Sequence, residues 1–162
     1  MLNSLFIFGA KYLFVLSFVL SGIFFLRQDW TTKKRIIYFA IPSLVLIFLL
    51  SIIANHLYFN PRPFVVGNYT PLIPHANDNG FPSDHVLLVS SVAAIFYYFN
   101  RKLSFILWFI ASVVAISRVY VGVHHFLDVF TSMFLSFVGV YPIYYFFKLK
   151  GFFQPKPPLE YL

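Results

Sequence analysis

Long apolar runs occupy most of this chain, and they constrain its fold more than any other feature of the sequence. About 20 apolar residues in a helix cross the roughly 30 Å of hydrocarbon in a bilayer, because each residue adds about 1.5 Å. With 60% hydrophobic and only 10% charged residues, the chain lacks the polar side chains that would cover such helices in water. We therefore predict an all-α, polytopic membrane helical bundle. Its five transmembrane helices are expected over about residues 5–26, 36–59, 84–100, 103–121 and 127–147.

The first apolar run, at about residues 5–26, is either a cleaved signal peptide or a retained transmembrane span. The sequence begins Met-Leu-Asn-Ser, with no basic residue, and the apolar run is longer than a signal peptide requires. We interpret it as a retained span. The third and fourth runs are shorter between their charged ends, so they cross only if those ends lie below the lipid headgroups. The chain contains no cysteine, which excludes disulfides, thiolate metal sites and cysteine nucleophiles.

Lysine and arginine are distributed unequally between the two sides of a five-span arrangement. Basic residues favour the cytoplasmic side of membrane proteins. The distribution predicts an outside N-terminus and a cytoplasmic C-terminus, and it explains most of the net charge of +7 without a nucleic-acid partner. One side holds Arg27, Lys33, Lys34, Arg35, Arg101, Lys102, Lys148, Lys150 and Lys156, whereas the other holds only Arg62 and Arg118.

The predicted organisation is a single transmembrane domain over residues 1–150, followed by a proline-rich, loosely ordered tail over 151–162. The longest non-helical stretch, 60–83, contains half of the chain's ten prolines. A loop longer than about 12–15 residues in a compact protein is usually functional. We therefore expect this loop to carry part of the active site.

Polar residues, most of them ionisable, gather at the ends of the spans on the predicted outer side. Charged groups at membrane depth are costly and mark functional sites by default. Two further ionisable residues, His75 and Asp78, lie in the long loop itself. The group at the span ends comprises Asn55, His56, Arg62, Ser83, Asp84, His85, Ser117, Arg118, His124, His125 and Asp128.

Several of these residues are suited to binding an anion. Arg62 and Arg118 carry planar guanidinium groups that match phosphate or carboxylate geometry. The string Phe-Pro-Ser-Asp-His before an apolar run is typical of a helix start with Ser83 as N-cap. The free N–H groups and the positive dipole end of a helix N-terminus attract anions.

Other residues are suited to attack and proton transfer. His124 and Asp128 are four apart, so they share a face if the segment is helical. A carboxylate that holds one imidazole nitrogen leaves the other free to act as nucleophile or base. His85 is a second histidine that can act as general acid. Together with the anion-binding groups, these residues indicate phosphoryl transfer.

The same residues form three motifs: Arg62-Pro63, then Pro82-Ser83-Asp84-His85, then Ser117-Arg118-x5-His124-x3-Asp128. Their types, order and spacing resemble the signature of the type 2 phosphatidic acid phosphatase superfamily. The resemblance implies that His124 attacks phosphorus to form a phosphohistidine, that Asp128 orients it, and that His85 protonates the leaving group. It also implies no metal and no cofactor. The implied phosphate ligands are Arg62, Arg118, Ser83 and the backbone N–H of Asp84.

Two positions depart from the family pattern. The family has lysine seven residues before Arg62, where this chain has Asn55, so a charge that would hold phosphate is absent. Asn55 either donates a neutral hydrogen bond to the phosphate or takes no part. The family usually has glycine where this chain has Asp84, which adds a carboxylate beside the anion.

The wider strings Tyr58–Phe64 and Leu72–His85, with Asp84, are similar to the bacitracin-resistance type of undecaprenyl-diphosphate phosphatase. This resemblance implies hydrolysis of undecaprenyl diphosphate at the outer face of the bacterial cytoplasmic membrane, for the recycling of the lipid carrier of peptidoglycan synthesis. His75 and Asp78 are expected to form loop hydrogen bonds or to contact the substrate.

Three alternatives stay open at this point. One is a phosphatase of another lipid phosphate, such as phosphatidylglycerophosphate, phosphatidate or lipid A. Another is a small transporter that uses His, Asp and Arg as a relay. The histidines and aspartates are also potential metal ligands, although the neighbouring arginines disfavour a cation.

Overall fold

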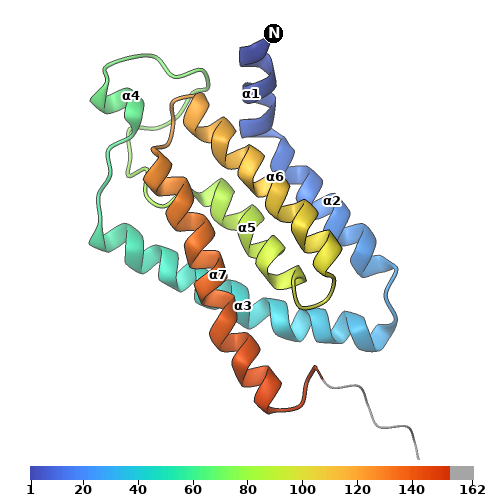
Figure 1. Ribbon diagram of the computed structural model, residues 1–162. Helices are drawn as coiled ribbons and strands as arrows, with labels where there is room; N and C mark the ends of the chain where they lie inside the picture. Colours follow the sequence, from blue (N-terminus) through green and yellow to red (C-terminus); the bar gives the residue numbers. More distant parts are fainter. Residues whose placement is uncertain (154–162) are drawn as a thin grey trace, which may run out of the picture.

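The computed structural model describes residues 1–153, and within this range it is helical with no β-strand (Figure 1). The predicted all-α class is confirmed. Residues 154–162, which hold Lys156 and most of the predicted tail, lie outside the described residues. The helices are α1 (Leu2–Lys11), α2 (Leu13–Leu26), α3 (Trp30–Leu57), α4 (Pro63–Val66), α5 (Asp84–Phe96), α6 (Arg101–Tyr120) and α7 (Phe126–Leu149).

Fewer helices than expected are long enough to cross a bilayer alone. By length and composition α3, α6 and α7 qualify, and α1 with α2 qualifies as one bent span, which gives three or four candidates rather than five. Helix α5 has only 13 residues, of which nine are buried. It packs against α2, α3, α6 and α7, and Figure 1 shows it in the middle of the bundle. Because protein surrounds α5, the ends of this short helix can lie at membrane depth without exposing backbone groups to lipid.

The first predicted span is not one continuous helix. It breaks at Tyr12, and α1 and α2 meet at an angle of 49°. Helix α1 lies against the end of α6, where the rings of Phe6 and Tyr120 stack with their centroids 3.9 Å apart. Gly9 permits this approach, because a Cβ atom there would lie 2.3 Å from Oγ of Ser117. The bend therefore lets α1 contact α6 while α2 follows α5 and α6.

Buried serines join α5 to α7 at close range. Oγ of Ser136 lies 2.7 Å from Oγ of Ser90 and 3.1 Å from Oγ of Ser91. Ser132 on α7 donates a hydrogen bond to the carbonyl of Ser83, at 2.9 Å. Small side chains let helices approach closely, and hydrogen bonds between them lock their relative register. This contact fixes the first half of α5 against the second and third turns of α7.

The ends of the bundle differ in character. The loop between α3 and α5 and the turn between α6 and α7 meet at one end, whereas the α2–α3 and α5–α6 turns and the end of α7 lie toward the other (Figure 1). Apart from Lys156, which lies outside the described residues, the basic residues that the sequence placed on one side of the membrane belong to the second end. Phe153, which the prediction assigned to the tail, packs against Phe39 and Tyr144, with each pair of ring centroids 5.4 Å apart.

Candidate active site

The predicted site residues converge at the end of the bundle that holds the long loop. His124 lies in the turn between α6 and α7, with 3% of its surface exposed. Arg62, which precedes α4, and Arg118, in the last turn of α6, are buried beside it at 5% and 3% exposure. Residues more than 60 positions apart in the sequence therefore meet around one imidazole.

The hydrogen bonds of His124 assign different roles to its two ring nitrogens. Nδ1 lies 2.9 Å from the carbonyl oxygen of Gly80, which can only accept, so Nδ1 carries the proton. Nε2 lies 3.4 Å from Nη1 of Arg62 and 3.3 Å from Nη2 of Arg118, and both are donors. The lone pair of Nε2 thus points into the space between two guanidinium groups. This is the arrangement that a nucleophile for a phosphate needs.

The expected role of Asp128 has to be adjusted. Its Oδ2 is 3.4 Å from Nδ1 of His124, so the Gly80 carbonyl is the nearer partner of that nitrogen. Asp128 is fully buried, and it accepts hydrogen bonds from Nδ2 of Asn60 at 2.7 Å and from the backbone N–H of His125 at 2.8 Å. It stabilises the turn that holds His124 and adds negative charge near its ring.

The surroundings of His124 keep its imidazole neutral. Burial lowers the pKa of His124 most, and the charges of Arg118 and Arg62 lower it further, against the raising effect of Asp128. The net pKa lies below the ordinary value of 6.5. At neutral pH the ring is therefore unprotonated at Nε2 and available for attack.

Arg62 is held in place from several sides. Its Nη1 donates to the carbonyl of Val123 at 2.9 Å, and its Nε donates to Oδ1 of Asp78 at 2.6 Å. Nη2 points to the carbonyl of Asn79, at 3.5 Å. Burial alone would raise the pKa of Asp78, but the hydrogen bond and the charge of Arg62 outweigh it and lower that pKa. Asp78, which belongs to the long loop, is therefore an ionised partner of Arg62.

Arg118 has a looser set of partners, and one of them is the second loop residue of the prediction. Its Nη2 lies 3.1 Å from Nε2 of His75. Burial, followed by the charges of Arg62 and Arg118, lowers the pKa of His75 to about 4. A neutral His75 accepts a hydrogen bond from Arg118, and protonation would place two cations side by side.

Ser83 is the N-cap residue of α5, as predicted, but its hydroxyl does not cap the helix. Its backbone N–H donates to the carbonyl of Asp128 at 3.3 Å, which ties the start of α5 to α7. Among residues 1–153, only four buried side-chain polar atoms have no hydrogen-bond partner, and three belong to this site. Those three are Oγ of Ser83, Nε of Arg118 and Nδ1 of His75, and the fourth is Oγ of Ser17.

The remaining residues of the second motif lie at the rim. His85, on the first turn of α5, is half-buried, and its ring meets that of Phe14 edge-on with centroids 5.3 Å apart. The side chain of Asp84 is exposed and lines a groove with Leu44 and Ser91. In the described part of the chain, Asp84 forms no ion pair with Arg118 or Arg62.

Asn55 is placed differently from the other predicted phosphate ligands. Its Nδ2 donates to the carbonyl of Phe81 at 2.7 Å, and its own carbonyl accepts from Asn79 at 3.0 Å. Asn55 thus fastens the long loop to the end of α3. The structure does not bring it to the two arginines.

Asn79 is the residue of this site whose importance the sequence did not suggest. Its side-chain oxygen accepts from the backbone N–H groups of Asn60 and Phe81, and its nitrogen donates to the carbonyls of Asn55 and Tyr58. These bonds aim the neighbouring Gly80 carbonyl at His124. The pair Asn79-Gly80 is typical of a turn, and this is the feature of the sequence that could have pointed to Asn79.

Within residues 1–153 no group of three or more His, Cys, Asp or Glu residues is arranged to hold a metal ion. The arginine pair and the helix N-terminus supply the positive charge of the site.

A family model described as the PAP2 superfamily matches residues 38–152, which contain all three motifs. The chain belongs to the PAP2 superfamily. Together with the candidate spans α3, α6 and α7, this membership supports an integral membrane protein.

Individual PAP2 relatives were also found. "Bacitracin transport permease protein BcrC" of Bacillus licheniformis is 35% identical over 131 residues, which cover 80% of this chain and 64% of that protein. The chain thus spans less than two thirds of that relative's length. "Undecaprenyl-diphosphatase BcrC" of Bacillus subtilis is 29% identical over 157 residues, with 95% and 78% coverage. These relatives place the chain with the bacitracin-resistance type of PAP2 protein.

The PAP2 fold is also seen in a solved structure. The crystal structure of Aquifex aeolicus LpxE matches with a TM-score of 0.65 at 23% identity, over 88% of this chain and 82% of that one. At this identity the likeness supports the fold alone.

Proposed function

We propose that this protein hydrolyses undecaprenyl diphosphate to undecaprenyl phosphate and inorganic phosphate, without a metal and through a phosphohistidine. One observation carries the proposal: Nε2 of His124 accepts from two buried arginines, while Nδ1 is held by the Gly80 carbonyl. A neutral imidazole in this setting is a nucleophile aimed at an anion-binding space.

In the first step, Nε2 of His124 attacks the terminal phosphorus in line with the bridging oxygen. A P–N bond forms, the bond from phosphorus to the bridging oxygen breaks, and His85 donates a proton to the departing lipid phosphate. Arg62, Arg118, the hydroxyl of Ser83 and the N–H of Asp84 stabilise the three equatorial oxygens. The protons on Nδ1 and on the guanidinium groups stay in place.

In the second step, water attacks the phosphohistidine and His85 accepts its proton. The P–N bond breaks, inorganic phosphate leaves and His124 returns to its neutral state. Asp128 stabilises the positive ring during the intermediate. We propose that His75, whose Nε2 lies on Arg118, donates from Nδ1 to the second phosphate of a diphosphate, whereas the carboxylate of Asp78 keeps Arg62 in position.

The substrate assignment rests on the Bacillus subtilis relative, whose name is that of an undecaprenyl-diphosphatase. A groove of about 410 Å³ runs from Asp84 between α3 and α5 and is lined by Leu44, Ile47, Phe48, Leu87, Leu88 and Ser91. We assign it to the first isoprene units of the substrate. A membrane-embedded tail then delivers the diphosphate to the site from the side.

The orientation follows from charge. The basic end of the bundle is opposite the site, and basic loops favour the cytoplasm. The site would thus face the outside of a bacterial cytoplasmic membrane, with the N-terminus outside and the C-terminus in the cytoplasm. We count the bent pair α1–α2 as the first span and α5 as a short fifth crossing, which gives this topology.

Transport is a less supported function, although the Bacillus licheniformis relative is named a transport permease. A transporter places its ionisable groups near the middle of the membrane, often between internal repeats. Here the histidines and arginines gather at one end of the bundle, around a nucleophile with a fixed proton.

The test is phosphate release by purified protein in detergent with EDTA. Undecaprenyl diphosphate is compared with phosphatidate and phosphatidylglycerophosphate. His124→Ala is the active-site variant, and His56→Ala is its control, because His56 is exposed and bonds only to the carbonyl of Ile52.

We expect EDTA-resistant release, fastest from the diphosphate, that is lost in His124→Ala and kept in His56→Ala. Release from the monophosphates alone would keep the histidine chemistry and contradict the substrate. No release from any lipid by folded protein would contradict the enzyme assignment.

A further inference from the structure

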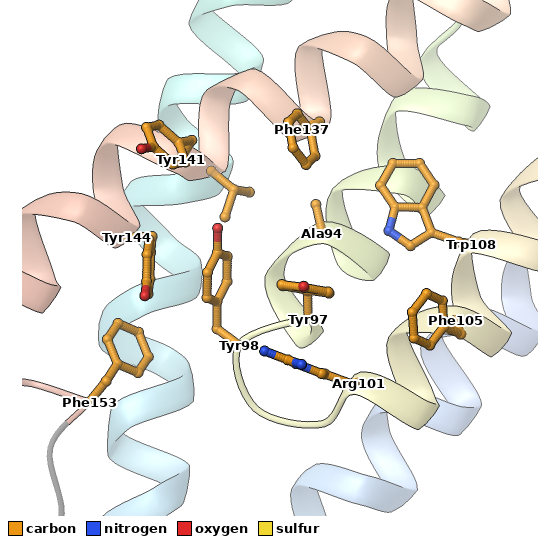
Figure 2. Close-up of a pocket in the computed structure, with 11 residues that line it drawn as sticks. Ala94, Tyr97, Tyr98, Arg101, Phe105, Trp108, Phe137, Tyr141, Tyr144 and Phe153 are labelled. Atoms are coloured by element: carbon orange, nitrogen blue, oxygen red, sulfur yellow. The ribbon is translucent and has the colours of Figure 1, made fainter.

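A second cavity lies at the end of the bundle opposite the active site. It has a volume of about 640 Å³ and is enclosed by the end of α5, the start of α6 and the second half of α7. Figure 2 shows its aromatic side chains arranged around a common space, with Arg101 at the turn. The proposed reaction uses none of these residues. The cavity is lined by Ala94, Tyr97, Tyr98, Arg101, Phe105, Trp108, Phe137, Val140, Tyr141, Tyr144 and Phe153.

The cavity opens sideways, toward the surface that a bilayer covers. Phe105 of α6 and Phe137 of α7 line it and are 66% and 65% exposed. Its inner wall is formed by buried Ala94 and Val140, and Tyr98 stacks on Tyr144 with centroids 4.2 Å apart. An apolar chain can therefore enter from the hydrocarbon without crossing water.

Positive charge surrounds the aromatic walls. The guanidinium of Arg101 lies over the ring of Tyr97, 5.4 Å from its centroid, and Nζ of Lys148 lies 6.0 Å from the ring of Tyr144. No acidic side chain is among the lining residues. Asp29 lies in the basic α2–α3 turn. Its carboxylate accepts hydrogen bonds from the backbone N–H and the hydroxyl of Thr32 at the start of α3.

The cavity is separate from the catalytic centre. Arg101 and Arg118 stand at the two ends of α6, and 17 helical positions correspond to about 25 Å. A phosphate held at Arg101 therefore does not reach His124, so the two ends of α6 hold different headgroups.

We propose that this cavity binds one anionic phospholipid of the surrounding membrane, with an acyl chain between α6 and α7 and the phosphate on Arg101. A soluble anion would leave the aromatic walls unused, and a zwitterionic lipid would leave the positive charge uncompensated. In Figure 2 the indole nitrogen of Trp108 and the guanidinium of Arg101 both face the lined space, which suits an ester oxygen and a phosphate. The lipid joins α5, α6 and α7 at this end.

Trp108 provides the probe. The chain has only two tryptophans, and the other, Trp30, is 68% exposed at the start of α3. In the Trp30→Phe protein, fluorescence reports on the cavity alone. The protein is placed in phosphatidylcholine bilayers that contain a small, equal fraction of either phosphatidylglycerol or phosphatidylcholine with brominated acyl chains, which quench a tryptophan that they touch.

We expect brominated phosphatidylglycerol to quench Trp108 more strongly than brominated phosphatidylcholine. Arg101→Gln should lower this preference about fivefold, as expected for one basic side chain at an anionic headgroup. The matched control is Lys102→Gln, which removes an exposed charge from the neighbouring residue outside the lining and should keep the preference.

Equal quenching by the two lipids would overturn the proposal, and this comparison does not depend on the folding of a charge variant. An unchanged preference in Arg101→Gln would also overturn it. An equal decrease in Arg101→Gln and Lys102→Gln would assign the effect to the basic surface as a whole and contradict a defined site.

Discussion

The two ends of the bundle hold their cations in opposite ways. At the catalytic end Arg62 and Arg118 are almost fully buried, and their nitrogens face a carbonyl, a carboxylate and imidazoles at fixed distances. At the other end Arg101 and Lys148 are exposed and lie over aromatic rings. Fixed donors suit a transition state, because they stabilise its developing negative charge without having to rearrange. Exposed cations that lie over aromatic rings suit a lipid headgroup that exchanges with the lipids of the bilayer.

The difference also has a structural cost at the catalytic end. Burying a guanidinium is unfavourable unless most of its donors are satisfied. Arg62 meets this condition through Val123 and Asp78, whereas Arg118 retains an unpartnered Nε. We infer that Arg118 depends more on the bound phosphate than Arg62 does. Variants at both ends test whether the cations differ in this way.

The largest effect among these comparisons is expected for Arg118→Gln. Loss of one preorganised donor to the transferring phosphoryl group should lower kcat on the order of 10²- to 10³-fold. Steady-state phosphate release measures it. A decrease of less than about tenfold in folded protein would show that Arg118 is an interface residue rather than a phosphate ligand.

Asn60→Ala should act mainly on stability. It removes the donor to Oδ1 of Asp128, which is fully buried, and an unsatisfied buried acceptor costs about 1–3 kcal/mol. Thermal unfolding in detergent should show a lower Tm than for the control Asn77→Ala, whose side chain is exposed in the same loop. An equal Tm for the two variants would contradict a supporting role for Asn60.

His75 should make stability depend on pH. Its folded pKa of about 4 lies below its ordinary 6.5, so between these values the unfolded chain binds a proton that the folded chain does not. Stability is therefore retained above about pH 6.5 and falls as the pH is lowered toward 4. Tm measured across this range should fall less in His75→Asn than in the parent protein. Parallel curves for the two proteins would contradict the assignment, and exposed His56→Asn is the control.

The smallest effect is expected at the basic end. Lys102→Gln changes an exposed side chain at the far end of α6 from Arg118, and such substitutions usually change free energies by less than about 0.5 kcal/mol. Its kcat should stay within about twofold of the parent value. A large loss would show that the two ends are coupled and would contradict their separate roles.

The sequence predicted the parts of this fold that depend on local patterns. Apolar runs located α6 and α7 to within two residues, because length and apolar composition define a membrane helix, whereas α3 begins six residues earlier than predicted. The motifs predicted that Arg62, Arg118 and His124 belong to one site, and in the structure both guanidinium groups lie beside Nε2 of His124. The His–Asp spacing of four also placed Asp128 beside His124, although not as its nearest partner.

Features that depend on tertiary contacts were not predictable in the same way. The break at Tyr12 follows from the packing of α1 on α6, and no proline marks it. The Gly80 carbonyl that holds His124 is a backbone group, so no side-chain pattern reveals it. The opposite cavity is built from aromatic residues that individually resemble lipid-facing ones, and only the crossing of α5, α6 and α7 gathers them.

The most direct test of the central claim is to trap the intermediate. Protein is mixed rapidly with undecaprenyl diphosphate that is radiolabelled on its terminal phosphate and denatured in base, which preserves phosphohistidine, and the labelled peptide is sequenced by mass spectrometry. We predict label on His124 that forms before free phosphate appears, is lost in acid, and is absent from His124→Gln. Phosphate release at the full rate with no label on the protein, or with label on His85 instead, would contradict the mechanism.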